Sequence, residues 1–223
     1  MKENDSARRI VEPSILSGFM ELLPKDQVAF NGMMDKIRYT FESYGFIPLD
    51  TPVLEKSEVL LAKSGGDTAK QVYRFTKGDT DMAMRFDLTV PLARYVAQHY
   101  GELAFPFRRY HIGKVYRGER PQKGRFREFY QCDIDIIGNG SLSINNDAEI
   151  VSIIYSVFKK LDIGHFTIMI NNRKLLNGFF DSLGVADKTE VLRIVDKLDK
   201  IGREGVREEL RKLNVSGESI EAL

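Results

Sequence analysis

The chain has 223 residues, of which 43% are hydrophobic and 29% are charged, and these are ordinary proportions for a globular protein. The formal net charge of +1 argues against nucleic-acid binding through overall charge and leaves only a local basic patch for that purpose. The single cysteine, Cys132, excludes an internal disulfide. No apolar run is long enough to span a bilayer, and the first residues lack the apolar core of a signal peptide. We therefore expect a cytoplasmic protein without a membrane span.

The first predicted elements are a helix and an edge strand. Apolar residues at helical spacing predict a helix over residues 27–44, and Gly45 is a natural C-terminal stop. Residues 46–55 are typical of a strand, but Pro48 and Pro52 cannot donate hydrogen bonds to a neighbouring strand. We therefore expect this strand at a sheet edge or at an interface, where a second subunit could pair with it.

Two further strands are predicted after a flexible loop at residues 64–67, one at 72–75 and one at 81–89. The second of these alternates, so that Asp87 and Thr89 lie on its polar face. Thr89 could also cap the helix that follows it. This segment therefore presents polar side chains where a strand passes into a helix.

The central feature is a predicted β-hairpin with strands at 110–117 and 126–137 and a polar loop at 118–125. Even positions of the second strand are apolar or nearly so, whereas three odd positions carry polar side chains: Gln131, Asp133 and Asp135. A period of two places these two sets on opposite faces of a sheet. One face can then pack on helices, while the other presents an amide and two carboxylates.

Cations surround this hairpin, and two interpretations compete for them. They are Arg108, Arg109, Lys114, Arg117, Arg120, Lys123, Arg125 and Arg127. A charged hairpin tip that serves only solubility is the usual explanation of such a run. Here, however, Arg117 ends an alternating strand, and Gly124 lets the loop approach a ligand closely. Because arginine binds phosphate through a bidentate fork, we favour a site for a triphosphate.

Hydrogen-bond acceptors on the strands suggest what the other end of the ligand is. The polar positions on otherwise apolar strands are Asp87, Thr89, Gln131 and Asp135. They face solvent if this side of the sheet is exposed, as one side of an antiparallel sheet commonly is. If the face is instead a pocket, its carboxylates require a cationic partner, such as the ammonium group of an amino acid or an imidazole.

No motif indicates a metal site or a Walker-type nucleotide site. The sequence contains no HExxH, CxxC or P-loop pattern and no GxSxG serine elbow. His111 shares the parity of Arg117 but has no cysteine or carboxylate at metal-ligand spacing. Cys132 lies on the apolar parity of its strand, which is typical of a core residue and not of a nucleophile. We therefore expect no metal ligands in this chain.

Helices dominate the rest of the chain. The predicted elements are a helix at 148–161 capped by Asp147, a strand at 165–170, and helices at 172–183, 188–200 and 203–213, with a further helix starting at 217. The fold class that this order predicts is α+β, with an antiparallel sheet flanked by helices. We expect one domain over 1–184 and the start of a helical domain over 185–223.

Three segments resemble the histidyl-tRNA synthetases, a family of class II aminoacyl-tRNA synthetases. RYHIGKVYRGERPQKGRFREFYQCDID is similar to the family's motif 2, and MRFDLTVPLARY is similar to its histidine-binding segment. The helix at 27–44 with FIPLDTPVLE is similar to motif 1, with Pro52 as its characteristic proline. DKLDK, at 196–200, resembles part of the family's insertion domain.

The resemblance implies a catalytic core of the class II type and a ligase activity. Such an enzyme uses ATP to activate histidine as histidyl-adenylate and then transfers the histidine to histidine tRNA, with Mg²⁺ bridging the phosphates. It also implies a homodimer formed through the motif 1 helix and strand. Rate enhancement would come mainly from positioning and from neutralising charge on the phosphorus.

The resemblance also implies roles for individual residues. Arg117 would be the catalytic residue that grips the α-phosphate and the histidine carboxylate. The residues implied for ATP binding are Arg117, Glu119, Arg125 and Phe129, the last by stacking on adenine. The residues implied for histidine binding are Asp87, Leu88, Thr89, Arg117, Gln131 and Asp135, with Asp87 and Thr89 at the ammonium group and Asp135 at the imidazole.

The chain departs from the family in what it lacks. The second histidine motif, motif 3 and the anticodon-binding domain are not found in the sequence. We therefore expect an N-terminal fragment that is inactive alone. One alternative is a non-catalytic paralogue such as the histidine-sensing regulatory subunit of ATP phosphoribosyltransferase, against which the complete ERPQKGR loop argues. The other is a plain nucleic-acid-binding domain, which predicts steeply salt-dependent binding of tRNA.

Overall fold

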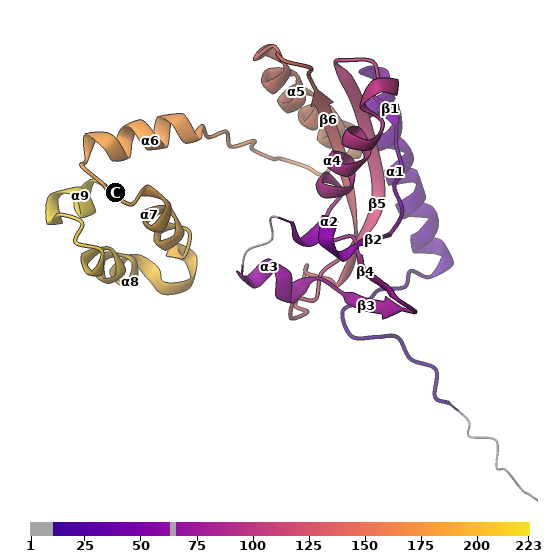
Figure 1. Cartoon of the computed structure of the whole chain (residues 1–223), viewed down its shortest axis with the longest axis horizontal. Coiled ribbons are helices and arrows are strands. Elements are labelled where there is room, and N and C mark those ends of the chain that lie inside the picture. Colours follow the sequence, from indigo (N-terminus) through magenta and orange to yellow (C-terminus); the bar gives the residue numbers. More distant parts are fainter. Residues whose placement is uncertain (1–10, 63–65) are drawn as a thin grey trace, which may run out of the picture. The chain divides into compact units, whose positions relative to one another are not determined.

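The structure, a computed structural model, describes residues 11–62 and 66–223, which form two units (Figure 1). The first unit ends at Phe166 and the second comprises Thr167–Leu223. The first combines small sheets with helices, which confirms the predicted α+β class. Its strands are β1 (Ile47–Pro48), β2 (Leu54–Lys56), β3 (Arg74–Lys77), β4 (Thr80–Met84), β5 (Phe107–Tyr116) and β6 (Glu128–Ile137). Its helices are α1 (Pro24–Ser43), α2 (Ser57–Leu61), α3 (Gly66–Gln71), α4 (Thr89–Gln98), the 3₁₀ helix η1 (Tyr100–Glu102) and α5 (Asn145–Leu161).

The predicted hairpin is the longest pair of strands in the first unit. β5 and β6 pair antiparallel over ten residues each, as the alternating sequence predicts. The face that carries Tyr110, Ile112 and Ile134 packs against α1 and α5, which run alongside the hairpin in Figure 1. The buried centre of this layer is formed by Met34, Ile37, Phe41, Phe46, Tyr110, Ile153 and Val157. This packing leaves the opposite face of the hairpin for other contacts.

The strand predicted at 46–55 is divided between two sheets. β1 pairs parallel with β5 at the edge of the sheet ordered β1-β5-β6, in agreement with the edge position that Pro48 predicts. β2 pairs antiparallel with β4 in the second sheet, ordered β2-β4-β3. The prediction of one continuous strand is therefore wrong, because the residues around Pro52 cross from one sheet to the other.

Several local predictions differ from the structure. Residues 64 and 65 of the loop predicted at 64–67 lie outside the described residues, and its last two residues, Gly66 and Asp67, begin α3. The strand predicted at 81–89 is β4, which ends at Met84. The strand predicted at 72–75 is β3, which begins two residues later, at Arg74. Residues 165–170 form no strand. Asp147 lies inside the first turn of α5, and the backbone N–H of Asn145 donates to Oγ of Ser143 (3.3 Å), so the helix begins earlier than predicted.

The second unit is a set of four helices: α6 (Arg173–Ser182), α7 (Lys188–Val195), α8 (Leu198–Lys212) and α9 (Gly217–Ala222). Side-chain caps from Asn172, Asp187 and Ser216 begin α6, α7 and α9. The core contains Phe180 of α6 together with residues of the three later helices. The boundary between the units is therefore near residue 166, earlier than the sequence predicts at 184, because the apolar face of α6 packs on the charged helices that follow it. No helix in the described part of the chain is long and apolar enough to cross a membrane.

Candidate active site

The pairing of β5 with β6 gathers the predicted site residues on one face. Gln131 lies opposite Gly113, and Asp135 lies opposite Arg109. Side chains of directly opposed residues in an antiparallel pair point to the same face, and here that face is opposite the α1 and α5 layer. Arg117 continues the same parity one residue beyond β5, where its backbone N–H donates to the carbonyl of Arg127 (2.9 Å). Arg117, Gln131 and Asp135 therefore share one side of the hairpin.

Arg117 is held between two aromatic rings. Its Cζ lies 4.5 Å from the ring centre of Phe86 and 5.0 Å from that of Phe129, and its Nε donates to the carbonyl of Phe86 (3.2 Å). These contacts fix the plane of the guanidinium group. Its two terminal nitrogens form no hydrogen bond or ion pair with any residue in the described ranges, so they remain able to bind an anion.

The loop residues predicted for ATP line one cavity. Its volume is about 400 Å³, and its walls are Arg117, Glu119, Gly124, Arg125, Phe126 and Phe129. Gly124 has φ of +76°, a conformation that glycine adopts without strain, and it lets the loop turn back toward the strands. Arg125 is 3.8 Å from Glu119 in a largely exposed ion pair, which is weak enough to be exchanged for a ligand.

The base of this loop is anchored to other segments of the first unit. Gly118 donates its N–H to the carbonyl of Gln71 at the end of α3 (2.7 Å). Arg127 donates from Nε to the carbonyl of Glu119 (3.0 Å) and from Nη1 to that of Ser17 (3.2 Å). Arg127 is one of the cations that surround the hairpin in the sequence. The structure uses its guanidinium to hold the loop.

The segment at 87–89 differs from its predicted conformation. It is not a strand, and Oδ1 of Asp87 accepts from the N–H groups of Thr89 (3.1 Å) and Val90 (2.9 Å) at the start of α4. Asp87 therefore caps this helix, and the prediction that Thr89 is the cap is wrong. Thr89 is exposed, whereas the side chain of Leu88 is fully buried and only its backbone can reach a ligand.

Two acceptors on the polar face lack a hydrogen bond. Oε1 of Gln131 and Oδ2 of Asp135 are buried, and neither accepts a hydrogen bond from any residue that the structure describes. Oδ2 of Asp135 lies 2.7 Å from Nη2 of Arg109, but this contact is an ion pair without hydrogen-bond alignment. Because buried acceptors are normally satisfied, both atoms are suited to accept an N–H from a ligand.

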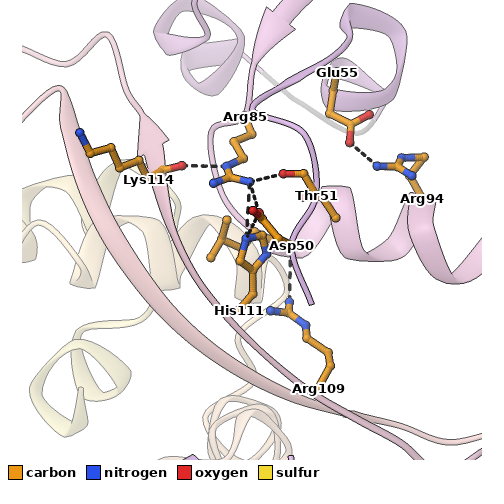
Figure 2. Close-up of polar contacts among 9 residues, drawn as sticks. Asp50, Thr51, Glu55, Arg85, Arg94, Arg109, His111 and Lys114 are labelled. Carbon is orange, nitrogen blue, oxygen red and sulfur yellow. Dashed lines mark hydrogen bonds and ion pairs between the residues drawn. The ribbon is translucent and has the colours of Figure 1, made fainter. Parts of the chain in front are cut away.

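Two buried side chains support this face: Arg85, which sequence analysis missed, and His111, to which it gave no role. Figure 2 shows Arg85 between the carbonyl groups of Lys114 and Thr51, to which it donates at 2.7 and 2.6 Å. His111 lies beside it, with Nε2 2.8 Å from Oδ1 of Asp50. Burial, and then the charge of Arg85, lower the pKa of His111 to about 4, so this imidazole is neutral at pH 7. Gly113 is the feature of the sequence that could have indicated this cluster, since a glycine inside a strand often marks a place where another group approaches the backbone closely.

Carboxylates gather at one end of the face. Burial raises the pKa of Asp133 above its usual range, and the nearby charges of Asp135 and Asp87 raise it further, while Arg109 and Arg117 oppose this shift. Asp87 is thus near enough to the hairpin to act on Asp133 although it lies on a different segment. The face therefore combines a cationic end at Arg117 with an acidic end at Asp87, Asp133 and Asp135.

Comparison with known proteins gives a consistent result. The family described as "Histidyl-tRNA synthetase" matches residues 18–223. The chain is 67% identical over 214 residues to a histidine–tRNA ligase of Clostridium tetani, covering 96% of this chain and 49% of that protein. It is 54% identical to a histidine–tRNA ligase of Finegoldia magna, with 96% and 50% covered. The chain thus spans about half the length of the curated relatives it matches.

Solved structures agree with these sequence matches. The histidyl-tRNA synthetase of Nostoc sp. PCC 7120 superposes with a TM-score of 0.83 at 41% identity, covering 96% of this chain and 48% of that one. A protein of Bacillus halodurans described as an ATP phosphoribosyltransferase regulatory subunit/histidyl-tRNA synthetase gives a TM-score of 0.75 at 23% identity, with 94% and 55% covered. At that identity the second likeness shows the fold alone, so it does not favour the regulatory alternative.

Proposed function

This chain belongs to the histidyl-tRNA synthetase family, and from that premise we propose that it carries the ATP-binding and histidine-binding elements of a histidine–tRNA ligase. In the proposed reaction a carboxylate oxygen of histidine attacks the α-phosphorus of ATP. The bond from that phosphorus to the bridging oxygen breaks, pyrophosphate leaves, and histidyl-adenylate forms. A hydroxyl oxygen of histidine tRNA then attacks the histidyl carbonyl carbon, the bond from that carbon to the phosphate oxygen breaks, and AMP leaves.

One observation carries this proposal. Arg117, with two uncommitted nitrogens, lies on the same face of the hairpin as two buried acceptors that lack a hydrogen bond, Oε1 of Gln131 and Oδ2 of Asp135. A ligand that satisfies both ends must present an anion to Arg117 and N–H donors to the acceptors. Histidine adenylate has this distribution of charge, with a phosphate at one end and an ammonium group and an imidazole at the other.

The residues of the proposed site divide the work. Arg117 binds the α-phosphate and the carboxylate and offsets the negative charge that develops there. Glu119, Arg125 and Phe129 hold the nucleotide, with Phe129 stacked on adenine. Asp87 and the backbone at Leu88 and Thr89 receive the ammonium group, while Gln131 and Asp135 orient the histidine side chain. Holding both reactants in line supplies most of the acceleration.

Magnesium enters this proposal only as part of the nucleotide. Within residues 11–62 and 66–223, no group of three histidine, cysteine or carboxylate side chains converges to hold a metal ion. The described residues therefore do not fit a protein cage for Mg²⁺. This ion usually keeps several waters and is held largely by the phosphates of its nucleotide, whose charge it neutralises.

We also propose a homodimer formed through α1 and β1. Large apolar side chains are exposed on these two elements: Val28, Met33, Tyr39 and Ile47. Exposed apolar side chains gathered on neighbouring elements are characteristic of protein interfaces. We place the protein in the cytoplasm, where tRNA is charged and where the free thiol of Cys132 stays reduced.

The test is histidine-dependent exchange of pyrophosphate into ATP. We would replace the matching half of the Clostridium tetani ligase with this chain, because the two are 67% identical over 214 residues. The purified chimera should catalyse exchange that requires L-histidine and should charge histidine tRNA. A folded chimera that binds histidine but catalyses no exchange would instead favour a histidine-sensing protein. Salt-dependent tRNA binding without histidine or ATP binding would favour a nucleic-acid-binding domain.

A further inference from the structure

Arg109 is a buried cation to which the proposed function assigns no role. It lies on the polar face of β5 directly opposite Asp135, and its side chain is 0% exposed. Burial lowers the pKa of its guanidinium, and the charges of Asp135 and Asp133 counter this effect. An arginine in such a position requires an explanation, because an apolar residue of similar volume is often as stabilising as a buried ion pair.

The contacts of Arg109 join two walls of the proposed histidine pocket. Its Nη2 lies 2.7 Å from Oδ2 of Asp135 on β6 and donates to the carbonyl of Leu88 (3.3 Å), just before α4. Its Nε and Nη1 are buried and donate to no residue in the described part of the chain. Two of the three guanidinium nitrogens therefore lack a hydrogen-bond partner among the described residues. The third, Nη2, connects the strand that carries Asp135 to the segment that carries Asp87.

We propose that Arg109 is a positioning residue for amino-acid selection, which acts by orienting the Asp135 carboxylate and tying it to the backbone of Leu88. This inference rests on the proposed function of the same site. The ion pair fixes one side of Oδ2 while leaving its hydrogen-bonding capacity open toward the ligand. The Leu88 contact keeps the ammonium-binding segment at a constant distance from the imidazole-binding strand.

The charges around Arg109 show why an arginine serves this purpose. The charges of Asp135 and Asp87 both act on Asp133 at this end of the face, and the charges of Asp135 and Asp133 act on Arg109. Like charges held close together repel, so without a cation the carboxylates would turn apart or take up protons. Asp135 would then present a different acceptor geometry to the imidazole. Histidine binding would weaken, while the nucleotide end at Arg117 would be little affected.

The neighbouring arginine is a matched control, because it lies on the opposite face. Arg108 donates to both carboxylate oxygens of Glu149 (3.0 and 2.7 Å) and to the carbonyl of Tyr44 (3.0 Å). These partners belong to the α1 and α5 layer, away from the proposed pocket. Arg108→Gln should therefore lower thermal stability without changing the selection of histidine. A purely structural role for Arg109 would give the same result at both positions.

The experiment measures histidine-dependent exchange by the chimera with Arg109→Gln, Arg109→Lys and Arg108→Gln. We expect Arg109→Gln to raise KM for histidine about 10- to 100-fold, since it leaves a buried carboxylate without its counter-charge. The KM for ATP should change less than about 2-fold. Discrimination between histidine and 1,2,4-triazolylalanine, which alters the ring nitrogens, should also decline. Arg109→Lys keeps the charge but not the fork, and it should lie between the wild type and Arg109→Gln.

Several outcomes would overturn the inference. Equal changes in KM for histidine and ATP, or equal effects of Arg109→Gln and Arg108→Gln, would show that Arg109 only supports the fold. If Arg109→Gln does not fold, the same comparison of the changes in KM for histidine and for ATP is made with Arg109→Lys. Absence of exchange in the wild-type chimera would count against the proposed function. Calorimetric titration of histidine into the same variants would then test Arg109 separately. Equal histidine affinities of the wild-type chimera and the Arg109 variants would contradict the proposal.

Discussion

Arg85 occupies the space in which a side chain at Gly113 would begin. A Cβ atom added to Gly113 would lie 2.5 Å from Nη2 of Arg85 and 2.8 Å from Nε2 of His111. Arg85 can cross the strand here only because position 113 has no side chain. The crossing brings its donors to the carbonyls of Lys114 and Thr51, and so links the hairpin to the segment between β1 and β2 (Figure 2).

Gly113→Ala should therefore destabilise the first unit. Both clashing groups are buried and hydrogen-bonded, so the strain cannot be relieved by moving a free side-chain end. We expect a loss of about 1–3 kcal/mol in the free energy of unfolding, which is the usual range for overpacking. Urea denaturation of the chain measures it. Gly32→Ala in α1 is the control: a Cβ there meets nothing within 4 Å, and alanine should stabilise the helix by up to about 1 kcal/mol.

His111 should make stability depend on pH. Its folded pKa of about 4 lies below the ordinary value of 6.5, so between these values the unfolded chain binds more protons than the folded chain. Stability should consequently fall as pH decreases from about 6.5 to 4, by roughly 3 kcal/mol from this group, and be fully retained above that window. Denaturation midpoints across this range measure the effect. His111→Gln should flatten the slope, whereas His99→Gln, which retains His111, should preserve it.

Much of the site followed from the period of two in the hairpin. Alternation alone placed Gln131 and Asp135 opposite the apolar side chains of β6, and the structure has them there. Burial of Arg109 could not be predicted, because a cation at a polar strand position is usually exposed. It becomes visible only when pairing sets Asp135 opposite it.

The elements that sequence misjudged share a physical cause. Asp87 and Thr89 are both good helix caps, and only the end of β4 at Met84 decides which of them reaches the first turn of α4. Residues 165–170 have an apolar composition suited to a strand but pair with no strand in the described ranges. In both cases the outcome depends on tertiary contacts that local sequence does not encode.

Arg117→Ala should strongly reduce histidine-dependent exchange while leaving the fold intact. The side chain makes one hydrogen bond and two ring contacts, so its removal should cost little stability. The loss of a cation at the reacting phosphate should lower exchange by about 100- to 1000-fold. Exchange by the chimera and its melting curve measure the two effects. Arg193→Ala, which removes an exposed arginine paired with Glu190 on α7, should change neither appreciably. Near-normal exchange by Arg117→Ala would exclude the assigned role.

Asp135→Asn should weaken histidine far more than ATP. The substitution keeps the size of the side chain but removes the negative charge beside Arg109 and replaces one acceptor with a donor. We expect KM for histidine to rise about 10- to 100-fold, with KM for ATP nearly constant. Asp133→Asn serves as the comparison, because it removes a neighbouring charge of the same face without touching Oδ2 of Asp135. Equal increases in both KM values would show that Asp135 does not receive the imidazole, and an equal effect at Asp133 would mean that only the net charge of the face matters.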